Sequence, residues 1–455
     1  MHEASQTLYF EQALLPSGWR QDVRLTIKSG VIAAIETDAH LKTGDARHAI
    51  GVPGVANLHS HAFQRAMSGL AEQRGPGDDT FWSWRETMYR FALSMNPEQV
   101  EAVAAQAYVE MLEAGYTSVG EFHYLHHAPD GRPYANTGEM AERIAAAAQA
   151  THIGLTLLPV FYAHSGFGGA EPTEAQRRFI CDLDLYARLV EQTSAIARAI
   201  DGGAIGIAPH SLRAATQDEL AAICGLSGQR PLHIHIAEQV AEVDASIAWS
   251  GARPVDWLLD HAQVDKRWCL VHATHMTPAE ARRVAASGAI VGLCPITEAN
   301  LGDGVFPAQE FIELGGRFGV GTDSNVQIAF AEELRLLEYS QRLTHRARNV
   351  LAISGGSTGR ALFDHARAGG AAALGRASDG IVVGADADIV TLKVDALDLI
   401  GRRGDALLDA WIFSRGNPVD CVYARGRLVV RDGAHLARGL IGDRFRATMI
   451  ELLAK

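Results

Sequence analysis

The chain has 455 residues, of which 47% are hydrophobic and 21% are charged, and its formal net charge is −12. This composition is typical of a globular protein with a large apolar core, and the acidic balance argues against nucleic acid as a partner because phosphate contacts need a basic face. No run of 18 or more apolar residues predicts a membrane span, and the first residues lack the basic and apolar pattern of a secretory signal.

The first fifty residues predict strands and turns. Val23–Lys28 and Val31–Ile35 flank Ser29-Gly30 and predict a β-hairpin, because apolar and polar residues alternate as in a half-buried strand. A similar β pattern returns near the end of the chain, at Ile389–Leu392, Cys421–Ala424 and Leu428–Val430. We therefore expect one small discontinuous β-sandwich domain, built from residues 1–50 and 380–455.

The middle of the chain, residues 51–379, alternates short apolar runs with helical stretches, including Pro97–Ala114, Glu174–Ile200 and Thr277–Ala286. Strand–helix alternation predicts a parallel α/β sheet, and eight units favour a closed (β/α)8 TIM-like barrel. No Gly-x-Gly-x-x-Gly follows an early strand, which weakens the dinucleotide-binding alternative. The eight predicted strands are Gly54–Leu58, Thr117–Phe122, Gly154–Val160, Ile205–Pro209, Leu232–Ile236, Trp268–Ala273, Ala289–Cys294 and Phe318–Gly321.

Histidines and acids recur where these predicted strands end. In an α/β barrel the catalytic groups lie at the C-terminal ends of the strands, so side chains from these separate segments should converge. The polar strand ends are His59-Ser60-His61, His210-Ser211-Leu212-Arg213, His233-Ile234-His235-Ile236-Ala237-Glu238, His272-Ala273-Thr274-His275 and Thr322-Asp323-Ser324.

The first of these segments predicts a metal site. His59 and His61 alternate on an extended strand, so both side chains point to one face and could bind a single divalent ion. His235 and Asp323 would complete a shell of nitrogen and oxygen donors, which suits zinc but would also hold iron or manganese. His233 shares the face of His235, so alternation alone does not choose the ligand between them.

Three polar residues near this site could be catalytic. Glu238 could shuttle protons beside the metal, although it could also be a solvated loop acid. His272 could hydrogen-bond water or polarise the substrate, and its alternative is a satisfied core histidine. Asp323 could instead be an ordinary turn residue. Their recurrence at successive strand ends favours the catalytic interpretation.

Seven segments together carry a resemblance to a known family. They are residues 57–67, 81–86, 121–124, 210–213, 233–239, 270–275 and 297–304. The chain resembles the amidohydrolase superfamily, and within it the formimidoylglutamate deiminase family of histidine degradation. The His-x-His and strand-end motifs mark only the superfamily, whereas Phe-Trp-x-Trp-Arg-Glu at 81–86 and Thr-Glu-Ala-Asn-Leu-Gly-Asp-Gly at 297–304 are much narrower.

The resemblance implies roles for eleven positions, and Asp323 serves in two roles. One zinc ion per subunit would be bound by His59, His61, His235 and Asp323, with His235 favoured over His233 because the family spaces this ligand three residues before the Glu. The implied catalytic residues are Glu238, His272 and Asp323. The implied substrate-binding residues are Gln64, Arg85, Tyr124, His210 and Arg213.

The implied reaction is the hydrolysis of N-formimino-L-glutamate to N-formyl-L-glutamate and ammonia by a homodimer. Asp323 and His272 would accept or orient the proton of water, and Glu238 would carry a proton to the leaving nitrogen. Arg85 and Arg213 are the natural clamps for the two substrate carboxylates, since guanidinium pairs with carboxylate in bidentate fashion. Each arginine could instead form an ordinary surface ion pair.

Two other functions stay open. Many relatives deaminate purines, pyrimidines or adenosine derivatives, and their sites need aromatic stacking and hydrogen bonds to base edges. An amidohydrolase-like chain can also be a scaffold without catalysis, although every proposed ligand is present here. The five scattered cysteines form no Cys-x-x-Cys pair and favour reduced thiols, so we expect a cytoplasmic protein.

Overall fold

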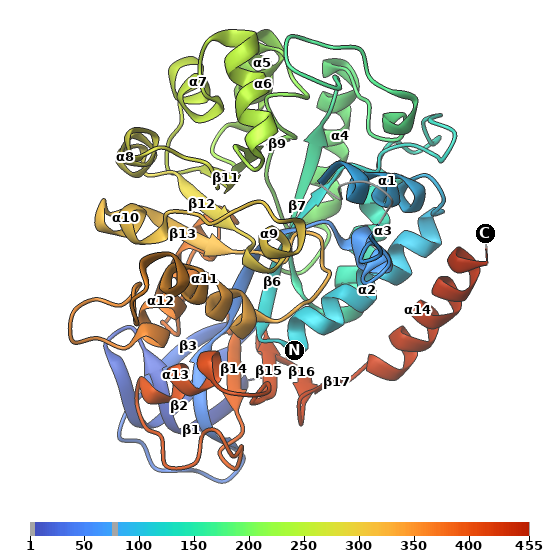
Figure 1. Ribbon diagram of the computed structural model, residues 1–455. Coiled ribbons are helices and arrows are strands. Elements are labelled where there is room, and N and C mark those ends of the chain that lie inside the picture. The colour runs from blue at the N-terminus through green and yellow to red at the C-terminus, as the bar shows by residue number, and fades with distance from the viewer. Residues whose placement is uncertain (1–4, 75–80, 455) are drawn as a thin grey trace.

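The computed structural model describes residues 5–74 and 81–454 (Figure 1). Residues 1–4 and 455 of the predicted β domain and residues 75–80 of the predicted barrel lie outside this description. Strands from both ends of the chain lie together in one part of the molecule, and the long middle of the chain forms the other part. Among the described helices, none has the length and apolar character needed to cross a membrane.

The strands from the two ends of the chain form one eight-stranded sheet in the order β17-β16-β15-β14-β4-β1-β2-β3. The predicted hairpin is confirmed, since β2 and β3 meet at Ser29 and Gly30, whose φ values of 50° and 81° suit a two-residue turn. The sheet encloses an apolar core of its own, as expected for the predicted terminal β-sandwich. The strands are β1 (Ser5–Leu15), β2 (Gly18–Lys28), β3 (Val31–Glu36), β4 (Ala46–Pro53), β14 (Ile389–Leu392), β15 (Val419–Ala424), β16 (Arg427–Arg431) and β17 (Ala434–His435).

The middle of the chain forms the predicted TIM-like barrel. One sheet contains β5 to β8, with β9 paired to β7, and a second sheet contains β10 to β13. Isolated parallel bridges join the two sheets at both seams, Ser60 with Asp323 and Ile207 with Leu232, so the strand order is cyclic. The strands are β5 (Val55–Ser60), β6 (Tyr116–His123), β7 (Gly154–Phe161), β8 (Ala204–Ile205), β9 (Ala208–Pro209), β10 (Leu232–Ile236), β11 (Trp268–His272), β12 (Ile290–Leu293) and β13 (Arg317–Val320).

Helices surround these strands, and their first turns are often capped by the local sequence. Capping boxes begin α2, from Asn96 to Gln99, and α8, from Thr277 to Glu280, which confirms two of the predicted helices. The helices are α1 (Phe81–Ala92), α2 (Pro97–Glu113), α3 (Glu139–Thr151), α4 (Leu183–Arg198), α5 (Gln217–Ser227), α6 (Val240–Ser250), α7 (Pro254–His261), α8 (Pro278–Ser287), α9 (Pro295–Leu301), α10 (Ala308–Glu313), α11 (Phe330–His345), α12 (Thr358–Ala373), α13 (Ala406–Phe413), α14 (Arg438–Leu453) and the short 3₁₀ turns η1 (Ala62–Met67) and η2 (Glu174–Gln176). The last helix, α14, packs on α2 outside the barrel.

The predicted helix over Glu174–Ile200 is wrong in its first part. Only η2 and α4 are helical, and the segment between them is irregular. Arg178 explains the difference, because its buried guanidinium donates hydrogen bonds to the backbone carbonyls of His127 and Met95. Asp182 then begins α4 as its N-cap, accepting a hydrogen bond of 2.7 Å from the Leu185 amide.

Candidate active site

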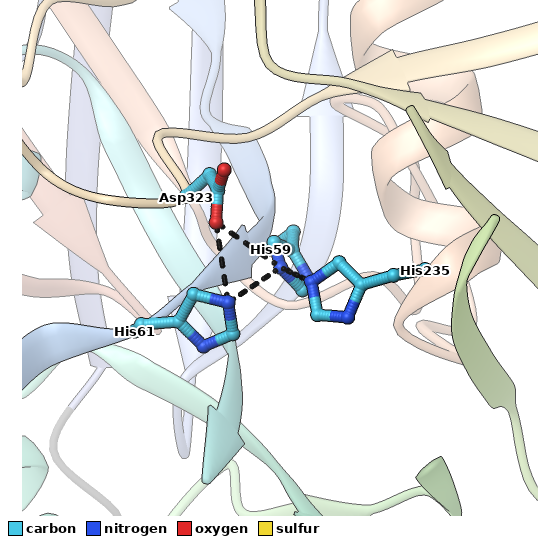
Figure 2. A group of neighbouring side chains, drawn as sticks. All are labelled: His59, His61, His235 and Asp323. Atoms are coloured by element: carbon cyan, nitrogen blue, oxygen red, sulfur yellow. Dashed lines mark hydrogen bonds and ion pairs between the residues drawn. The ribbon is translucent and has the colours of Figure 1, made fainter. Parts of the chain in front are cut away.

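Four side chains converge at the C-terminal ends of the barrel strands (Figure 2). His59 is the second-last residue of β5, His61 follows that strand, His235 lies on β10, and Asp323 follows β13. The Nε2 atom of His59 lies 3.2 Å from that of His61 and 3.0 Å from that of His235, and His61 Nε2 lies 3.2 Å from Asp323 Oδ1. His233 lies outside this cluster, since its Nε2 bonds to the Ala373 carbonyl at 2.8 Å.

The hydrogen bonds of the cluster fix the tautomers of two rings. The Nδ1 atoms of His61 and His235 each lie 3.0 Å from a backbone carbonyl, of Phe122 and His210 respectively. A carbonyl only accepts, so both rings carry hydrogen on Nδ1 and turn a bare Nε2 lone pair inward. Burial also lowers the pKa of His59 to about 3 and holds the pKa of His235 well below its usual value.

This donor set fits a divalent cation. Two imidazole lone pairs and the Asp323 carboxylate converge on one point, and at most one hydrogen, from His59, is available to satisfy them. Neutral imidazoles whose other nitrogen donates to a backbone carbonyl are the usual geometry of protein metal ligands. The four predicted ligands therefore form a candidate site for a divalent metal ion.

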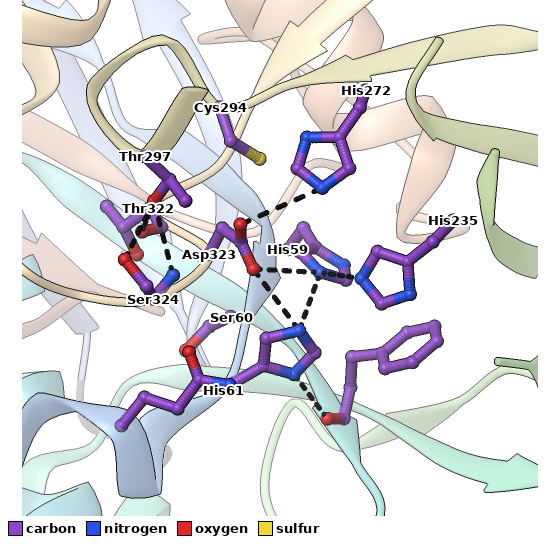
Figure 3. Close-up of polar contacts among 12 residues, drawn as sticks. His59, Ser60, His61, His235, His272, Cys294, Thr297, Thr322, Asp323 and Ser324 are labelled. Carbon is purple, nitrogen blue, oxygen red and sulfur yellow. Dashed lines mark hydrogen bonds and ion pairs between the residues drawn. The ribbon is translucent and has the colours of Figure 1, made fainter. Parts of the chain in front are cut away.

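The three predicted catalytic residues also lie side by side. His272 Nε2 is 3.7 Å from Glu238 Oε1 and 3.8 Å from Asp323 Oδ2, as Figure 3 shows for the Asp323 pair. Burial raises the pKa of the Glu238 carboxyl. Burial alone would lower the pKa of His272, but the carboxylates of Glu238, Glu298 and Asp323 hold it well above its usual value. Carboxyl and imidazole groups in such contact can hold and exchange protons.

Two buried glutamates that the sequence interpretation missed hold this group in place. Glu298 Oε1 lies 3.2 Å from His272 Nδ1 and accepts a 2.9 Å hydrogen bond from the Cys294 amide. Glu242, at the start of α6, accepts hydrogen bonds from the amides of Ala237 and Glu238 at 3.2 and 3.0 Å. Glu298 belongs to the narrow family segment at 297–304, but only the fold reveals its contact with His272.

The loop after β13 is strained and tightly held. Asn325 Nδ2 lies 3.1 Å from Ser60 Oγ and from the carbonyls of His61 and Asp323, so it ties this loop to the end of β5. Thr297 of α9 also bonds to Ser324, with 2.9 Å between hydroxyls (Figure 3). Non-glycine residues with left-handed φ cluster at the strand ends, at a cost of about 1–3 kcal/mol each. They are Ala237 (50°), His272 (67°), Ala273 (50°), Asp323 (45°) and Asn325 (55°).

A cavity opens onto the cluster. All five predicted substrate-binding residues line it, namely Gln64, Arg85, Tyr124, His210 and Arg213. The three predicted catalytic residues also line it, together with His61 and His235. The sequence interpretation missed the other lining residues, which are Trp84, Met88, Tyr89, Tyr162, Ser165, Phe179 and Leu301. Tyr162 directly follows β7, so its position at a strand end was a signal that could have revealed it.

Two arginines that line the cavity, Arg85 and Arg213, bring positive charge to it. Among residues 5–74 and 81–454, no side chain or carbonyl forms a hydrogen bond or ion pair with the Arg213 guanidinium. Burial works to lower the pKa of Arg213, but the nearby carboxylates of Glu242 and Glu238 raise it above its usual value. Arg85 Nη2 donates to the Tyr162 hydroxyl at 3.2 Å, and its guanidinium lies over the Tyr89 ring at 5.1 Å. The site therefore combines a carboxylate-rich end with two guanidinium groups.

Comparison with known proteins agrees with this site. A family model described as the amidohydrolase family matches residues 50–429, and the chain belongs to that family. A model described as the N-terminal domain of formimidoylglutamate deiminase HutF matches residues 6–49. The formimidoylglutamate deiminase of Pseudomonas aeruginosa is 49% identical over 450 residues, covering 98% of this chain and 99% of that protein.

Solved structures show the same fold. An amidohydrolase from Brucella melitensis has a TM-score of 0.96 and 57% identity, covering 98% of this chain and 100% of that one. An adenosine deaminase from Xanthomonas campestris, described with bound zinc, has a TM-score of 0.82 with 22% identity, and the match covers 99% of both chains.

A more distant relative in sequence is a 5-methylthioadenosine/S-adenosylhomocysteine deaminase of Natronomonas pharaonis. It is 27% identical over 423 residues, covering 90% of this chain and 88% of that protein.

Proposed function

We propose that this chain is a metal-dependent formimidoylglutamate deiminase, which hydrolyses N-formimino-L-glutamate to N-formyl-L-glutamate and ammonia in histidine degradation. The observation that carries the proposal is 49% identity, over almost the whole of both chains, to a protein of that name. The intact cluster of His59, His61, His235 and Asp323 supports a hydrolytic enzyme rather than a scaffold that has lost its ligands.

The charge pattern of the cavity fits this substrate. N-formimino-L-glutamate carries an amidine, which is a cation when protonated, and two carboxylates. The carboxylates of Glu238 and Asp323 and the guanidinium groups of Arg85 and Arg213 all line the cavity. A neutral purine or pyrimidine offers no carboxylate to the Arg213 guanidinium, which lines the cavity. This argues against the alternative of a nucleobase or adenosine-type aminohydrolase.

We propose zinc as the metal, one per subunit, because three imidazole nitrogens and one carboxylate oxygen are typical zinc donors; iron(II) and manganese(II) also suit them. His59, His61, His235 and Asp323 would hold it. When bound, such an ion lowers the pKa of water to about 7 and so supplies a nucleophile at neutral pH.

The roles of the surrounding residues follow from their positions. Asp323 and His272 would accept or orient the proton of the attacking water, since both lie against the metal site. Glu238 would carry a proton to the leaving nitrogen, so that the tetrahedral adduct loses ammonia. Arg213 and Arg85 would bind the carboxylates. Three further lining residues would position the substrate, namely Gln64, Tyr124 and His210.

We also propose a cytoplasmic homodimer whose partner is a small dicarboxylate substrate. All five cysteines are unpaired, which suits a reducing compartment. Residues 1–50 with 380–455 would be the small domain and residues 51–379 the catalytic barrel. Light scattering on the purified protein tests the dimer.

Ammonia release tests the proposed activity. Purified protein is assayed with N-formimino-L-glutamate and, in parallel, with adenosine, 5-methylthioadenosine and 8-oxoguanine. We expect turnover only of the amidine. Turnover of a nucleoside or base in preference to the amidine would refute the proposal and restore the alternative aminohydrolase.

A further inference from the structure

The hydroxyl of Tyr162 accepts two hydrogen bonds at the edge of the cavity. Arg85 Nη2 donates to it at 3.2 Å, and Gln176 Nε2 donates to it at 2.8 Å. The orientation of the Gln176 amide is fixed, because its Oε1 already accepts from the amide of Thr173 at 2.7 Å. The Gln176 group facing Tyr162 is therefore the NH₂ donor and not the carbonyl oxygen.

Two accepted bonds use both lone pairs of the phenol oxygen, so its own hydrogen must donate elsewhere. Among residues 5–74 and 81–454, no group accepts a hydrogen bond from it. Tyr162 is 5% exposed and lines the cavity, with its ring 4.5 Å from that of His210. A buried donor without an acceptor is costly, so an acceptor is expected to arrive with the ligand.

We propose that the Tyr162 hydroxyl donates a hydrogen bond to a substrate carboxylate held by Arg85, which makes Tyr162 a specificity-determining residue. The inference rests on the proposed function, since it assigns one carboxylate of that substrate. A cationic donor to the phenol oxygen polarises its O–H bond and strengthens donation to an anion. Gln176, 1% exposed, keeps the phenol aimed at this point.

Removing only the hydroxyl tests the inference. Tyr162→Phe should lower kcat/KM for N-formimino-L-glutamate by about 10- to 100-fold, mainly through KM, because a hydrogen bond to a charged group is lost. The matched control is Tyr186→Phe, since the Tyr186 hydroxyl bonds to the Pro159 carbonyl at 3.0 Å and lies outside the cavity lining. The control should keep the kinetic constants of the unmodified enzyme, and unchanged constants in Tyr162→Phe would overturn the inference.

Two truncated substrates show whether a carboxylate is the acceptor. N-formimino-4-aminobutanoate lacks the α-carboxylate, and N-formimino-2-aminobutanoate lacks the side-chain carboxylate. With the truncated substrate that keeps the contacted carboxylate, Tyr162→Phe should still lower kcat/KM strongly. With the truncated substrate that lacks this carboxylate, Tyr162→Phe should change kcat/KM very little. An equal loss with all three substrates would overturn the inference, because it would show a general disturbance of the site.

A double variant separates direct contact with the substrate from an effect through Arg85. Adding Tyr162→Phe to the Arg85→Met enzyme should weaken substrate binding further. If the double variant bound the substrate as well as Arg85→Met does, Tyr162 would act only by holding Arg85, against the inference. Calorimetry with glutarate, an unreactive dicarboxylate, gives a readout independent of turnover. If the unmodified enzyme released no ammonia, the proposed function would fail. Weaker glutarate binding by Tyr162→Phe would still support the carboxylate contact in that case, and equal glutarate binding would refute it.

Discussion

Glu238 is buried, lies 3.7 Å from His272 Nε2, and lines the same cavity as His235 and Asp323. Glu238→Gln keeps the shape and most hydrogen bonds but cannot exchange a proton. We expect normal metal content and a fall in kcat of about 10²–10⁴-fold, the usual contribution of general acid–base catalysis. Elemental analysis and ammonia release on the same sample measure both, and full activity in this variant would remove the proton-shuttle role.

Glu298 orients His272 through the Nδ1 atom, at 3.2 Å. Glu298→Ala should lower kcat by about 10–100-fold with little change in KM or metal content, since the imidazole loses its orienting partner. Glu298→Gln should restore part of the rate, because an amide oxygen still accepts from Nδ1.

Glu333 supplies the matched control for Glu298. It anchors the same helix, α9, by accepting from the Ile296 amide at 2.9 Å, and burial holds its pKa well above the usual value, so Gln is close to its protonated form. Glu333→Gln should leave kcat near normal. Equal losses of kcat in Glu298→Ala and Glu333→Gln would show that Glu298 acts only by placing α9.

Single residues also show the limits of sequence reasoning at the site. His59 and His61 lie at the end of one apolar strand and Asp323 follows another, so the barrel pattern predicted their convergence. Glu298 could not be found this way, because its contact depends on how α9 returns over β11. Alternation alone did not choose between His233 and His235, and the family resemblance favoured His235. The fold adds the physical reason, since the His233 ring bonds to the Ala373 carbonyl.

At the scale of elements, α12 covers the seam where β13 meets β5. Two glycines let the helix backbone approach the strands closely. A Cβ atom on Gly369 would lie 1.8 Å from the Phe318 carbonyl oxygen of β13, and one on Gly370 would lie 2.8 Å from the Ala56 carbonyl oxygen of β5. These contacts are with backbone atoms, which cannot move aside as a side chain can.

Gly369→Ala should therefore destabilise the fold by about 2–3 kcal/mol or more, as overpacking against a strand does. Gly439→Ala in α14 is the control, because a Cβ there meets no atom within 4 Å. That change should raise stability by about 0.5–1 kcal/mol through helix propensity. Urea unfolding measures both, and equal stability of the two variants would contradict the close packing of α12.

Elements differed in how well the sequence predicted them. Continuous apolar runs such as Ile290–Leu293 located the buried strands, because a parallel strand is apolar on both faces. Helical periodicity failed around Arg178, where a buried guanidinium bonds to distant carbonyls and overrides local propensity. The fourth strand was predicted as one run but is divided into β8 and β9, a break that the apolar pattern does not reveal.

At the scale of the whole molecule, Asp388 lies at the junction of the β-sheet and the barrel. The Gly54 amide bonds to its backbone carbonyl at 2.9 Å, and its side chain accepts from the Arg425 amide at 2.8 Å. Burial raises the pKa of its carboxyl to about 6, although the Arg425 amide and the Arg376 guanidinium lower it. The junction therefore favours the protonated form of Asp388.

The sign of the pH effect follows from this raised pKa. The favourable contribution of protonated Asp388 is present below the unfolded-state pKa of about 3.9 and is lost as pH rises through 6. Asp388→Asn mimics the neutral form, so it should match the parent at low pH and exceed its stability by up to about 2 kcal/mol above pH 7. Urea unfolding at pH 5 and pH 7.5 measures this gain, and a gain that does not grow with pH would refute the assignment.

We propose that His59, His61, His235 and Asp323 hold one catalytic metal ion. The most direct measurement returns zinc in steps to chelated protein and follows ammonia release from N-formimino-L-glutamate. We predict that the rate rises linearly and levels off at one equivalent per chain, and that His235→Ala shows no such rise. Full activity in the chelated protein, or an unchanged titration in His235→Ala, would contradict the claim.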